Sequence, residues 1–262
     1  MALLEVNNLT KAFGGLTAVN DVSFSIEKNE ITGLIGPNGA GKTTIFNLIT
    51  GVYKVTSGNI IFNEINIENK DTYKIAQYGI TRTFQNIRLF KKLTVFENIL
   101  TACHNNAAYS LGESILFGGL PVFLNKKTRF YKEEKMLKHQ AEELMEIMGL
   151  SDRRNFIANN LPYGLQRRLE IARALASNPK LLLLDEPAAG MNPDETEKLM
   201  ELIMEIRDRF DLTVLLIEHH MDLVMGVCDN IVVLNFGCKL AEGSPFEVQN
   251  NPLVKEAYLG GE

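Results

Sequence analysis

The segment Gly36-Pro37-Asn38-Gly39-Ala40-Gly41-Lys42-Thr43 constrains the fold of this chain more than any other. It fits the pattern G-x-x-x-x-G-K-[ST], in which glycines let several backbone N–H groups converge on one phosphate. The apolar run Ile31–Ile35 before it predicts a strand, and we expect a helix to begin near Gly41. A strand, a glycine-rich loop and a helix N-terminus in this order predict a phosphate site, whereas a chance glycine-rich turn would not need both neighbours.

The loop also predicts which groups meet the nucleotide. Lys42 is expected to reach the β- and γ-phosphates, and the hydroxyl of Thr43 to ligate Mg²⁺. The backbone around them completes the cradle, so the candidate nucleotide-binding positions are Asn38, Gly39, Ala40, Gly41, Lys42, Thr43 and Thr44. ATP and Mg²⁺ are therefore the expected ligands.

A second pattern supplies two carboxylates. The apolar run Leu181–Leu184 is followed directly by Asp185 and Glu186, as in a buried strand that ends in acids. Alone, this pattern also fits acids that cap a strand at the surface. Together with the loop, it predicts a strand beside the P-loop strand, with Asp185 near the magnesium ion and Glu186 polarising the attacking water.

The order of the predicted elements gives the fold class. Apolar alternation over residues 3–6 and 19–26 favours antiparallel strands near the N-terminus. Strands alternate with helices in the second half, which predicts a parallel sheet. Between them lies a helix-rich stretch, with helices expected at 93–102, 126–148 and 165–176 and no assignment for 105–125. The chain is thus an α/β protein interrupted by a helical insertion.

With these residues in view, the sequence resembles the ABC (ATP-binding cassette) ATPases. Thr83-Phe84-Gln85 resembles the family's glutamine motif, which implies that Gln85 contacts Mg²⁺ or the attacking water. Leu216-Ile217-Glu218-His219 resembles the switch histidine motif, which implies that His219 reaches the γ-phosphate, whereas His220 is expected to face solvent. The family's signature sequence corresponds to Leu161–Leu165, with Gly164 toward phosphate, and Ala189–Pro193 to a loop that communicates across a dimer.

The resemblance implies a fold and a division of the chain. We expect a P-loop ABC ATPase with a RecA-like parallel-sheet core, an N-terminal antiparallel β subdomain and an inserted α-helical subdomain. The core would comprise residues 1–85 and 161–262, and the insertion residues 86–160. Phe13 is the expected adenine-stacking residue, with Val19 beside it; the alternative is that Phe13 belongs to the core.

Within the family, the chain resembles the ATP-binding subunits of branched-chain amino acid importers. The stretches TRTFQNIRLF (81–90), GLQRRLEIAR (164–173) and DEPAAGMNP (185–193) carry this likeness, as does the tail after Asn251. It implies an ATPase at the cytoplasmic face of a membrane that works with permease subunits, a second ATPase (itself or a paralogue) and, indirectly, a periplasmic or extracellular substrate-binding protein. A urea importer, a lipopolysaccharide-extracting ATPase and a soluble ABC protein acting on ribosomes or DNA are the alternatives.

The signature departs from the family pattern at Leu165, which replaces the usual glutamine, and at Pro162. Pro162 stands where the common signature has a serine whose hydroxyl bonds the γ-phosphate held by the facing subunit. Proline has no donor, although Gly164 and the following helix N-terminus still offer backbone N–H groups. The asymmetry implies that Pro162→Ser alters hydrolysis at the partner's site only.

Composition limits the expected partners and the compartment of the chain. A formal net charge of −5 argues against a nucleic-acid partner, since such proteins usually carry a basic excess. The chain's 3 cysteines are scattered without a C-x-x-C, which fits a reducing compartment. The longest apolar runs are far shorter than the ~20 residues that span a bilayer. Any attachment to a membrane is therefore expected to come from another chain.

Overall fold

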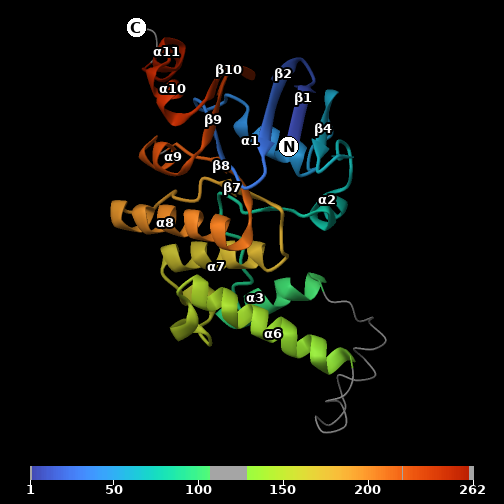
Figure 1. The fold of residues 1–262 in the computed structure, drawn as a ribbon, viewed down its shortest axis with the longest axis vertical. Helices are drawn as coiled ribbons and strands as arrows, with labels where there is room; N and C mark the ends of the chain where they lie inside the picture. The colour runs from blue at the N-terminus through green and yellow to red at the C-terminus, as the bar shows by residue number, and fades with distance from the viewer. Residues whose placement is uncertain (1, 107–128, 220, 260–262) are drawn as a thin grey trace. The chain divides into compact units, whose positions relative to one another are not determined.

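The computed structural model describes residues 2–106, 129–219 and 221–259 (Figure 1). The chain forms two compact units. The first comprises Met1–Asn86 and Pro179–Glu262, and the second comprises Ile87–Asn178. The second unit thus extends beyond residue 160, where we expected the core to resume, because the helix that follows the signature segment packs with the other helices of this unit.

A six-stranded sheet forms the centre of the first unit. Its order is β10-β9-β3-β8-β7-β6, and all neighbours are parallel except β10 and β9. The strands are β10 (Cys238–Gly243), β9 (Asn230–Asn235), β3 (Ile31–Ile35), β8 (Thr213–Ile217), β7 (Leu181–Asp185) and β6 (Ile80–Arg82). The prediction that the Asp185 strand lies beside the P-loop strand was wrong, because β8 lies between β3 and β7.

These strands are central because they are apolar on both faces. Every residue of β3, β7 and β8 is buried, which is the pattern of a parallel sheet covered on both sides. On one face, α9 (Met221–Val227) packs closely on Gly33, where a β-carbon would lie 3.2 Å from Val224. Leu34 lies on the other face, in a core shared with α1 (Lys42–Ile49).

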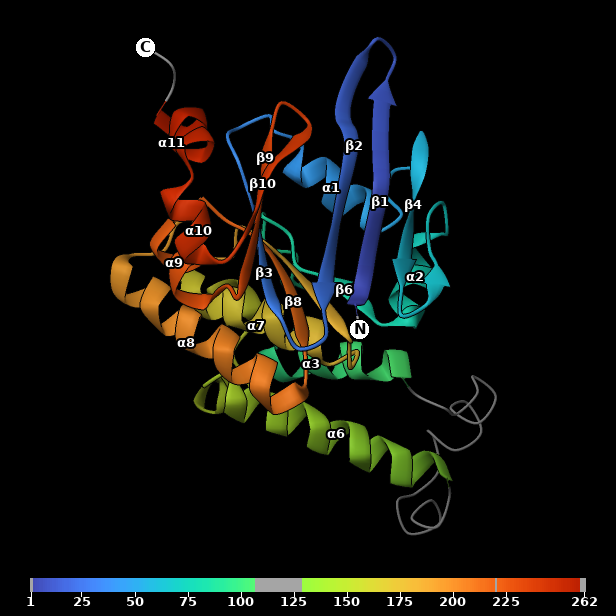
Figure 2. The ribbon, with the colours of Figure 1, turned by 45° about the horizontal axis from the view of Figure 1, so that its top comes forward.

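A second sheet covers the far side of α1, so that this helix lies between two sheets (Figure 2). Its order is β2-β1-β4-β5, and every pair is antiparallel. The strands are β1 (Ala2–Phe13), β2 (Leu16–Glu27), β4 (Ser57–Phe62) and β5 (Ile65–Asn66). The predicted antiparallel β subdomain is confirmed, and its first two strands are longer than the sequence alternation indicated.

The remaining helices of the first unit lie outside the sheets. α2 (Thr72–Tyr78) precedes β6, and α8 (Pro193–Phe210) begins at a capping box between Asn192 and Glu195. α10 (Pro245–Asn250) and α11 (Pro252–Leu259) end the described chain. The sequence analysis missed six elements, because they are short or lack clear apolar periodicity. They are α2, β5, β6, β10, α10 and α11.

The second unit is helical, as predicted. It contains α3 (Val95–Cys103), α6 (Arg129–Ile147), α7 (Tyr163–Leu175) and the short 3₁₀ turns η1 (His104–Asn106), η2 (Ser151–Arg153) and η3 (Ala158–Asn160). The expected helix start at 126 and residues 107–125 of the stretch without assignment lie outside the described residues. In α7, the buried Arg167 pairs with Glu170 at 2.7 Å, and Glu170 also accepts the backbone N–H of Arg88.

Across the part of the chain that the structure describes, every helix is too short or too polar to cross a bilayer.

Candidate active site

The P-loop joins β3 to α1, and two of its glycines are required by close backbone contacts. At Gly36, where φ is +150°, a β-carbon would lie 2.2 Å from the carbonyl oxygen of Leu234. At Gly41, where φ is +102°, it would lie 2.7 Å from the carbonyl oxygen of Ala18. Any other residue would push the loop off β9 and β2, so the glycines set the position of the cradle and not only its curvature.

A cavity of about 190 Å³ opens over this loop. It is lined by seven loop residues, Asn38, Gly39, Ala40, Gly41, Lys42, Thr43 and Thr44, together with Ala18, Glu186 and His219. A larger cavity of about 670 Å³ lies on the other side of Asn38 and Gly39, against α11 and Phe236, but Lys42, Thr43 and Glu186 do not line it. The smaller cavity is therefore the one that brings the predicted phosphate-binding groups together.

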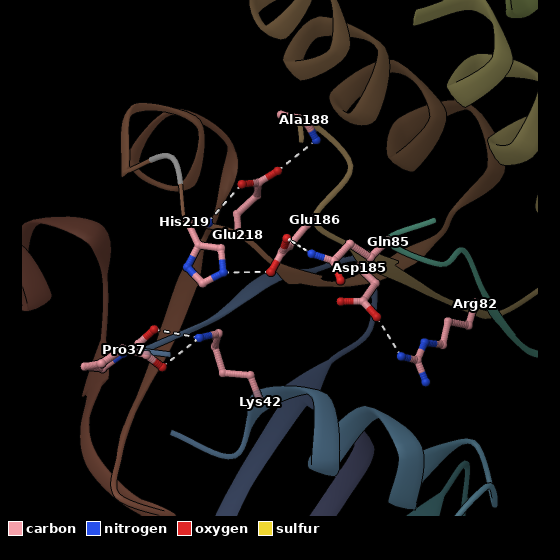
Figure 3. Close-up of polar contacts among 10 residues, drawn as sticks. Pro37, Lys42, Arg82, Gln85, Asp185, Glu186, Ala188, Glu218 and His219 are labelled. Carbon is pink, nitrogen blue, oxygen red and sulfur yellow. Dashed lines mark hydrogen bonds and ion pairs between the residues drawn. The ribbon is translucent and has the colours of Figure 1, made fainter. Parts of the chain in front are cut away.

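Lys42 extends along the loop. Its ammonium donates hydrogen bonds to the carbonyl oxygens of Gly36 at 2.6 Å and Pro37 at 3.0 Å (Figure 3). Burial lowers the pKa of Lys42, and the nearby carboxylates of Glu186 and Asp185 oppose that shift. An ammonium has three donors, so after these two bonds one donor remains for a phosphate oxygen.

Glu186 lies where three motifs meet. Its Oε2 accepts a hydrogen bond from Gln85 Nε2 at 2.6 Å, and its Oε1 lies 2.7 Å from His219 Nε2 (Figure 3). Its φ of +48° places a non-glycine residue in the left-handed region, a costly conformation that is concentrated at functional sites. A carboxylate has about four acceptor positions, so this arrangement orients Glu186 and leaves capacity to accept a proton from water.

Asp185 ends β7 next to Glu186 and is nearly buried. Its Oδ2 forms an ion pair with Arg82 at 2.6 Å, and each side chain is only 7% exposed. The other oxygen points toward the space between Glu186 and Lys42 (Figure 3). A carboxylate, the Thr43 hydroxyl and the side-chain oxygen of Gln85 are ligands that suit Mg²⁺, which protein sites commonly hold together with the phosphates of a substrate. The residues present thus fit a magnesium–nucleotide complex.

Glu218 is a site residue that the sequence analysis did not select. It is 1% exposed, and it accepts hydrogen bonds from the backbone N–H groups of Ala188 at 2.8 Å and His219 at 2.9 Å. It therefore ties the loop after Glu186 to the segment that carries His219 (Figure 3). Its only sequence signal is an acid at the end of the buried strand β8. His220 lies outside the described residues.

The two predicted adenine-side residues differ in exposure. Phe13 ends β1 and is 42% exposed, with its ring edge-on to Tyr53 and Lys11 Nζ 4.7 Å above it. The alternative that Phe13 is a core residue is therefore wrong. Val19 is fully buried, so its side chain cannot contact a nucleotide as expected. Its Cγ2 atom lies 3.4 Å from the position that a β-carbon on Gly41 would take, and the neighbouring Ala18 lines the cavity.

Gly164 belongs to the second unit. It is half-buried in the first turn of α7, one residue after the helix begins at Tyr163. Pro162 caps this helix without a side-chain hydrogen bond, and its carbonyl accepts the N–H of Gln166 at 3.0 Å. The first N–H groups of a helix have no partner within the helix, so α7 begins with donors that suit an anion.

Comparison with known proteins identifies the architecture. Residues 19–189 match the family model described as "ABC transporter", and residues 238–262 match the model described as "Branched-chain amino acid ATP-binding cassette transporter". The protein named high-affinity branched-chain amino acid transport ATP-binding protein LivG of Salmonella typhimurium is 49% identical over 258 residues, covering 98% of each chain. The protein of the same description named BraF, from Pseudomonas aeruginosa, is 46% identical over 98% of each chain.

Solved structures agree with this match. The crystal structure of the ADP conformation of MJ1267, described as an ATP-binding cassette of an ABC transporter, superimposes with a TM-score of 0.83 at 34% identity, covering 100% of both chains. A nucleotide-free ATP-binding cassette from an ABC transporter gives a TM-score of 0.82 at 35% identity, again over 100% of both. The chain therefore belongs to the ABC transporter family of ATP-binding ATPases, within the group of branched-chain amino acid transport ATP-binding proteins.

Proposed function

We propose that this chain hydrolyses ATP to drive the import of branched-chain amino acids across a membrane. The cavity that gathers the P-loop, Glu186 and His219 supports the ATPase step. The relatives named for branched-chain amino acid transport, at 49% and 46% identity over nearly the whole chain, support the cargo. A urea importer or a lipopolysaccharide-extracting ATPase remains the alternative assignment within the family.

In this mechanism, the P-loop backbone and Lys42 hold the phosphates, and Phe13 stacks on the base. A magnesium ion held by Thr43, Gln85 and Asp185 would neutralise charge on the transferring phosphoryl group. Glu186 orients the attacking water and accepts its proton, because Gln85 and His219 fix both of its oxygens at 2.6 and 2.7 Å. His219 completes the site on the γ-phosphate side.

The assembly we propose is a dimer of ATPase subunits at the cytoplasmic face of the membrane, bound to permease subunits. In this arrangement, the α7 N-terminus and Gly164 of one subunit meet the nucleotide held by the other. The candidate contacts for a permease helix are Asn86, Arg88, Leu89 and Phe90, with a core role for Leu89 and Phe90 as the alternative. The 47% exposure of Phe90 argues against that alternative for Phe90, whereas Leu89 is half-buried. A substrate-binding protein outside the membrane would deliver the amino acid. No nucleic acid takes part.

A trapping experiment tests the assembly. Glu186→Gln should keep ATP binding and lose the base, so the tagged variant with ATP and Mg²⁺ should retain the ATP-bound complex during purification from detergent-solubilised membranes. Recovery of permease chains and a second ATPase supports the proposal. Recovery of the chain alone, or of ribosomes, contradicts the transport role while leaving the ATPase unaffected.

An uptake assay tests the cargo. Cells that lack this chain should regain uptake of radiolabelled leucine, isoleucine and valine when they express the wild-type chain or Lys28→Ala, which changes an exposed lysine outside the site. Lys42→Ala should not restore uptake, because the phosphate cradle loses its cation. If the wild-type chain restores uptake of urea but not of leucine, the proposed cargo is wrong and the urea importer is the correct assignment.

A further inference from the structure

Arg82 occupies an unusual position for a charged side chain. It ends β6, and its guanidinium carbon lies 5.3 Å from the centroid of the Phe46 ring and 5.1 Å from that of the Phe84 ring. Only 7% of the side chain is exposed. Burying a cation is costly unless it is paired and hydrogen-bonded, so the contacts that hold Arg82 are expected to serve a purpose.

Those contacts connect three elements of the first unit. One terminal nitrogen of Arg82 donates to Asn47 Oδ1 on α1 at 2.7 Å, and the other donates to Asp185 Oδ2 at the end of β7 at 2.6 Å. The Nε atom has no hydrogen-bond partner among the described residues, so these hydrogen bonds of Arg82 come from its two terminal nitrogens. The guanidinium thus bridges the P-loop helix and the carboxylate that faces the magnesium position.

The geometry leaves Asp185 with one oxygen occupied and one directed into the site. Oδ2 is held by Arg82, and the other oxygen points toward the space between Glu186 and Lys42 (Figure 3). Gln85 follows Arg82 by three positions, and the backbone between them is pinned to β7 where the N–H of Thr83 bonds the carbonyl of Leu183 at 2.9 Å. Arg82 therefore fixes the carboxylate of Asp185, and the Thr83 hydrogen bond fixes the start of the segment that carries Gln85.

On the basis of the proposed function, we infer that Arg82 is a positioning residue for the magnesium ion of the nucleotide site. It holds Asp185 by one oxygen so that the other is presented to the ion or to a water on the ion. Partners that orient metal ligands typically change metal affinity by ~10–100-fold when removed. Charge alone would act in the opposite direction, since removing a cation beside Asp185 should strengthen its attraction for a metal ion.

The sign of the change therefore separates the two effects. Mn²⁺ can be titrated by electron paramagnetic resonance into the chain saturated with a non-hydrolysable ATP analogue. Arg82→Met should weaken Mn²⁺ binding by about 10-fold or more, and Arg82→Lys should restore only part of it, because an ammonium lacks the planar fork with which the guanidinium holds Asn47 and Asp185 at once. Unchanged or tighter Mn²⁺ binding by Arg82→Met overturns the inference.

Two controls distinguish positioning from general damage. Binding of the same analogue in EDTA should be unaffected by Arg82→Met, and an equal loss with and without metal would mean a merely structural role and overturn the inference. Arg207→Met removes another paired arginine, bonded to Asp208 at 2.8 Å, and should bind Mn²⁺ as the wild type does. If Arg82→Met does not fold, Asn47→Ala frees the other end of the bridge, and a several-fold loss of Mn²⁺ affinity is expected.

The wild-type titration separates this inference from the proposed function. If the wild-type chain fails to bind the analogue at all, the proposed nucleotide site is wrong. If it binds the analogue in EDTA but shows no Mn²⁺ binding beyond that of the free analogue, the Arg82 inference fails and the ATP site remains.

Discussion

At the scale of single residues, the site is held together by buried groups that contact no substrate. Glu218 is the clearest case, because its two oxygens accept the N–H groups of Ala188 and His219 at 2.8 and 2.9 Å. Hydrogen bonds to a charged group are stronger than neutral ones, at ~1.5–3 kcal/mol. The position of the histidine thus depends on a carboxylate one residue before it.

We predict that Glu218→Gln keeps ATP binding but lowers turnover. The amide retains one acceptor and places a donor against a backbone donor, so His219 should lose its fixed position. The loss of one charge-assisted bond, about 1.5 kcal/mol, corresponds to ~10-fold in rate. Steady-state ATPase assays check the result, with the exposed Glu201→Gln as the matched control. If Glu218→Gln turns over ATP at the wild-type rate, the hydrogen bonds of Glu218 to Ala188 and His219 are not needed for catalysis.

The thiols give a second residue-scale prediction. Burial raises the pKa of Cys103 to about 11 and that of Cys228 to about 12, whereas Cys238 is exposed. Since the thiolate is the reactive form, the native chain should take up one maleimide at pH 8, at Cys238, and all 3 thiols should react in denaturant. Mass spectrometry measures the number of maleimides per chain, and the folded Cys238→Ser variant should take up no maleimide.

The same shifts predict a pH dependence of stability. Unfolded thiols ionise near their ordinary pKa of 9.0, while the folded Cys228 keeps its proton to about 12. The unfolded state then binds fewer protons, so the free energy of unfolding should fall as pH rises from 9 toward 12. Cys228→Ala should show a smaller decline than the wild type in denaturant titrations.

The residues that the sequence could predict are those in compact motifs. Lys42, Thr43, Asp185 and Glu186 stand in patterns whose chemistry requires those residue types, and the structure brings the lysine and both carboxylates to one place. Arg82 and Glu218 could not be selected, because each acts through at least one partner distant in sequence. The hydrogen-bond partners of Arg82 lie 35 and 103 positions away, and an arginine at the end of a short strand carries no periodic signal.

At the scale of elements, the P-loop depends on the strand beside it as much as on its own sequence. Gly36 lies so close to β9 that a β-carbon would overlap the carbonyl oxygen of Leu234. The φ of +150° is also unfavourable for a residue with a side chain. The cradle is therefore positioned by the sheet.

We predict that Gly36→Ala abolishes detectable ATP binding. The overlap at 2.2 Å must be relieved by moving the loop away from β9, which displaces Lys42 and its hydrogen bond to the Gly36 carbonyl. Fluorescence titration with an ATP analogue measures the loss. Gly15→Ala, in the β1–β2 turn with open space around it, should bind as the wild type does. Normal binding by Gly36→Ala would mean that the loop adapts.

The sequence predicted which segments are strands more readily than how they are ordered. β3, β7 and β8 are all short, fully buried apolar runs, so their patterns are interchangeable and cannot specify neighbours. That is why β7 was expected next to β3. The order depends on which crossover helices cover which face, a property of the whole sheet.

At the scale of the whole molecule, the chain supplies two half-sites that face different nucleotides in the proposed dimer. The P-loop, Glu186 and His219 lie in the first unit, and Gly164 lies in the second. The proline at 162 affects only the second half-site, because it gives no hydroxyl at the start of α7. Its effect should appear at the partner's nucleotide.

Mixed dimers test this prediction when one copy carries Glu186→Gln, so that a single site hydrolyses ATP. Pro162→Ser on the Glu186→Gln copy should lower the KM for ATP by up to about 10-fold, since an added bond to phosphate is worth ~1.5 kcal/mol. The same change on the copy with intact Glu186 should leave hydrolysis unaltered. Equal effects from both placements would contradict the head-to-tail arrangement.

The strand order also has a consequence for folding during synthesis on the ribosome. β3 is made early, yet its two neighbours in the sheet are β8 at Thr213–Ile217 and β9 at Asn230–Asn235, near the end of the chain. The phosphate cradle contacts β9, so a nascent chain cannot complete it until Asn230–Asn235 has been made. Nucleotide can stabilise only the folded form. Cellular ATP therefore gives no protection while the amino-terminal segments emerge from the ribosome, and their apolar strands stay prone to aggregation until β8 and β9 have been made.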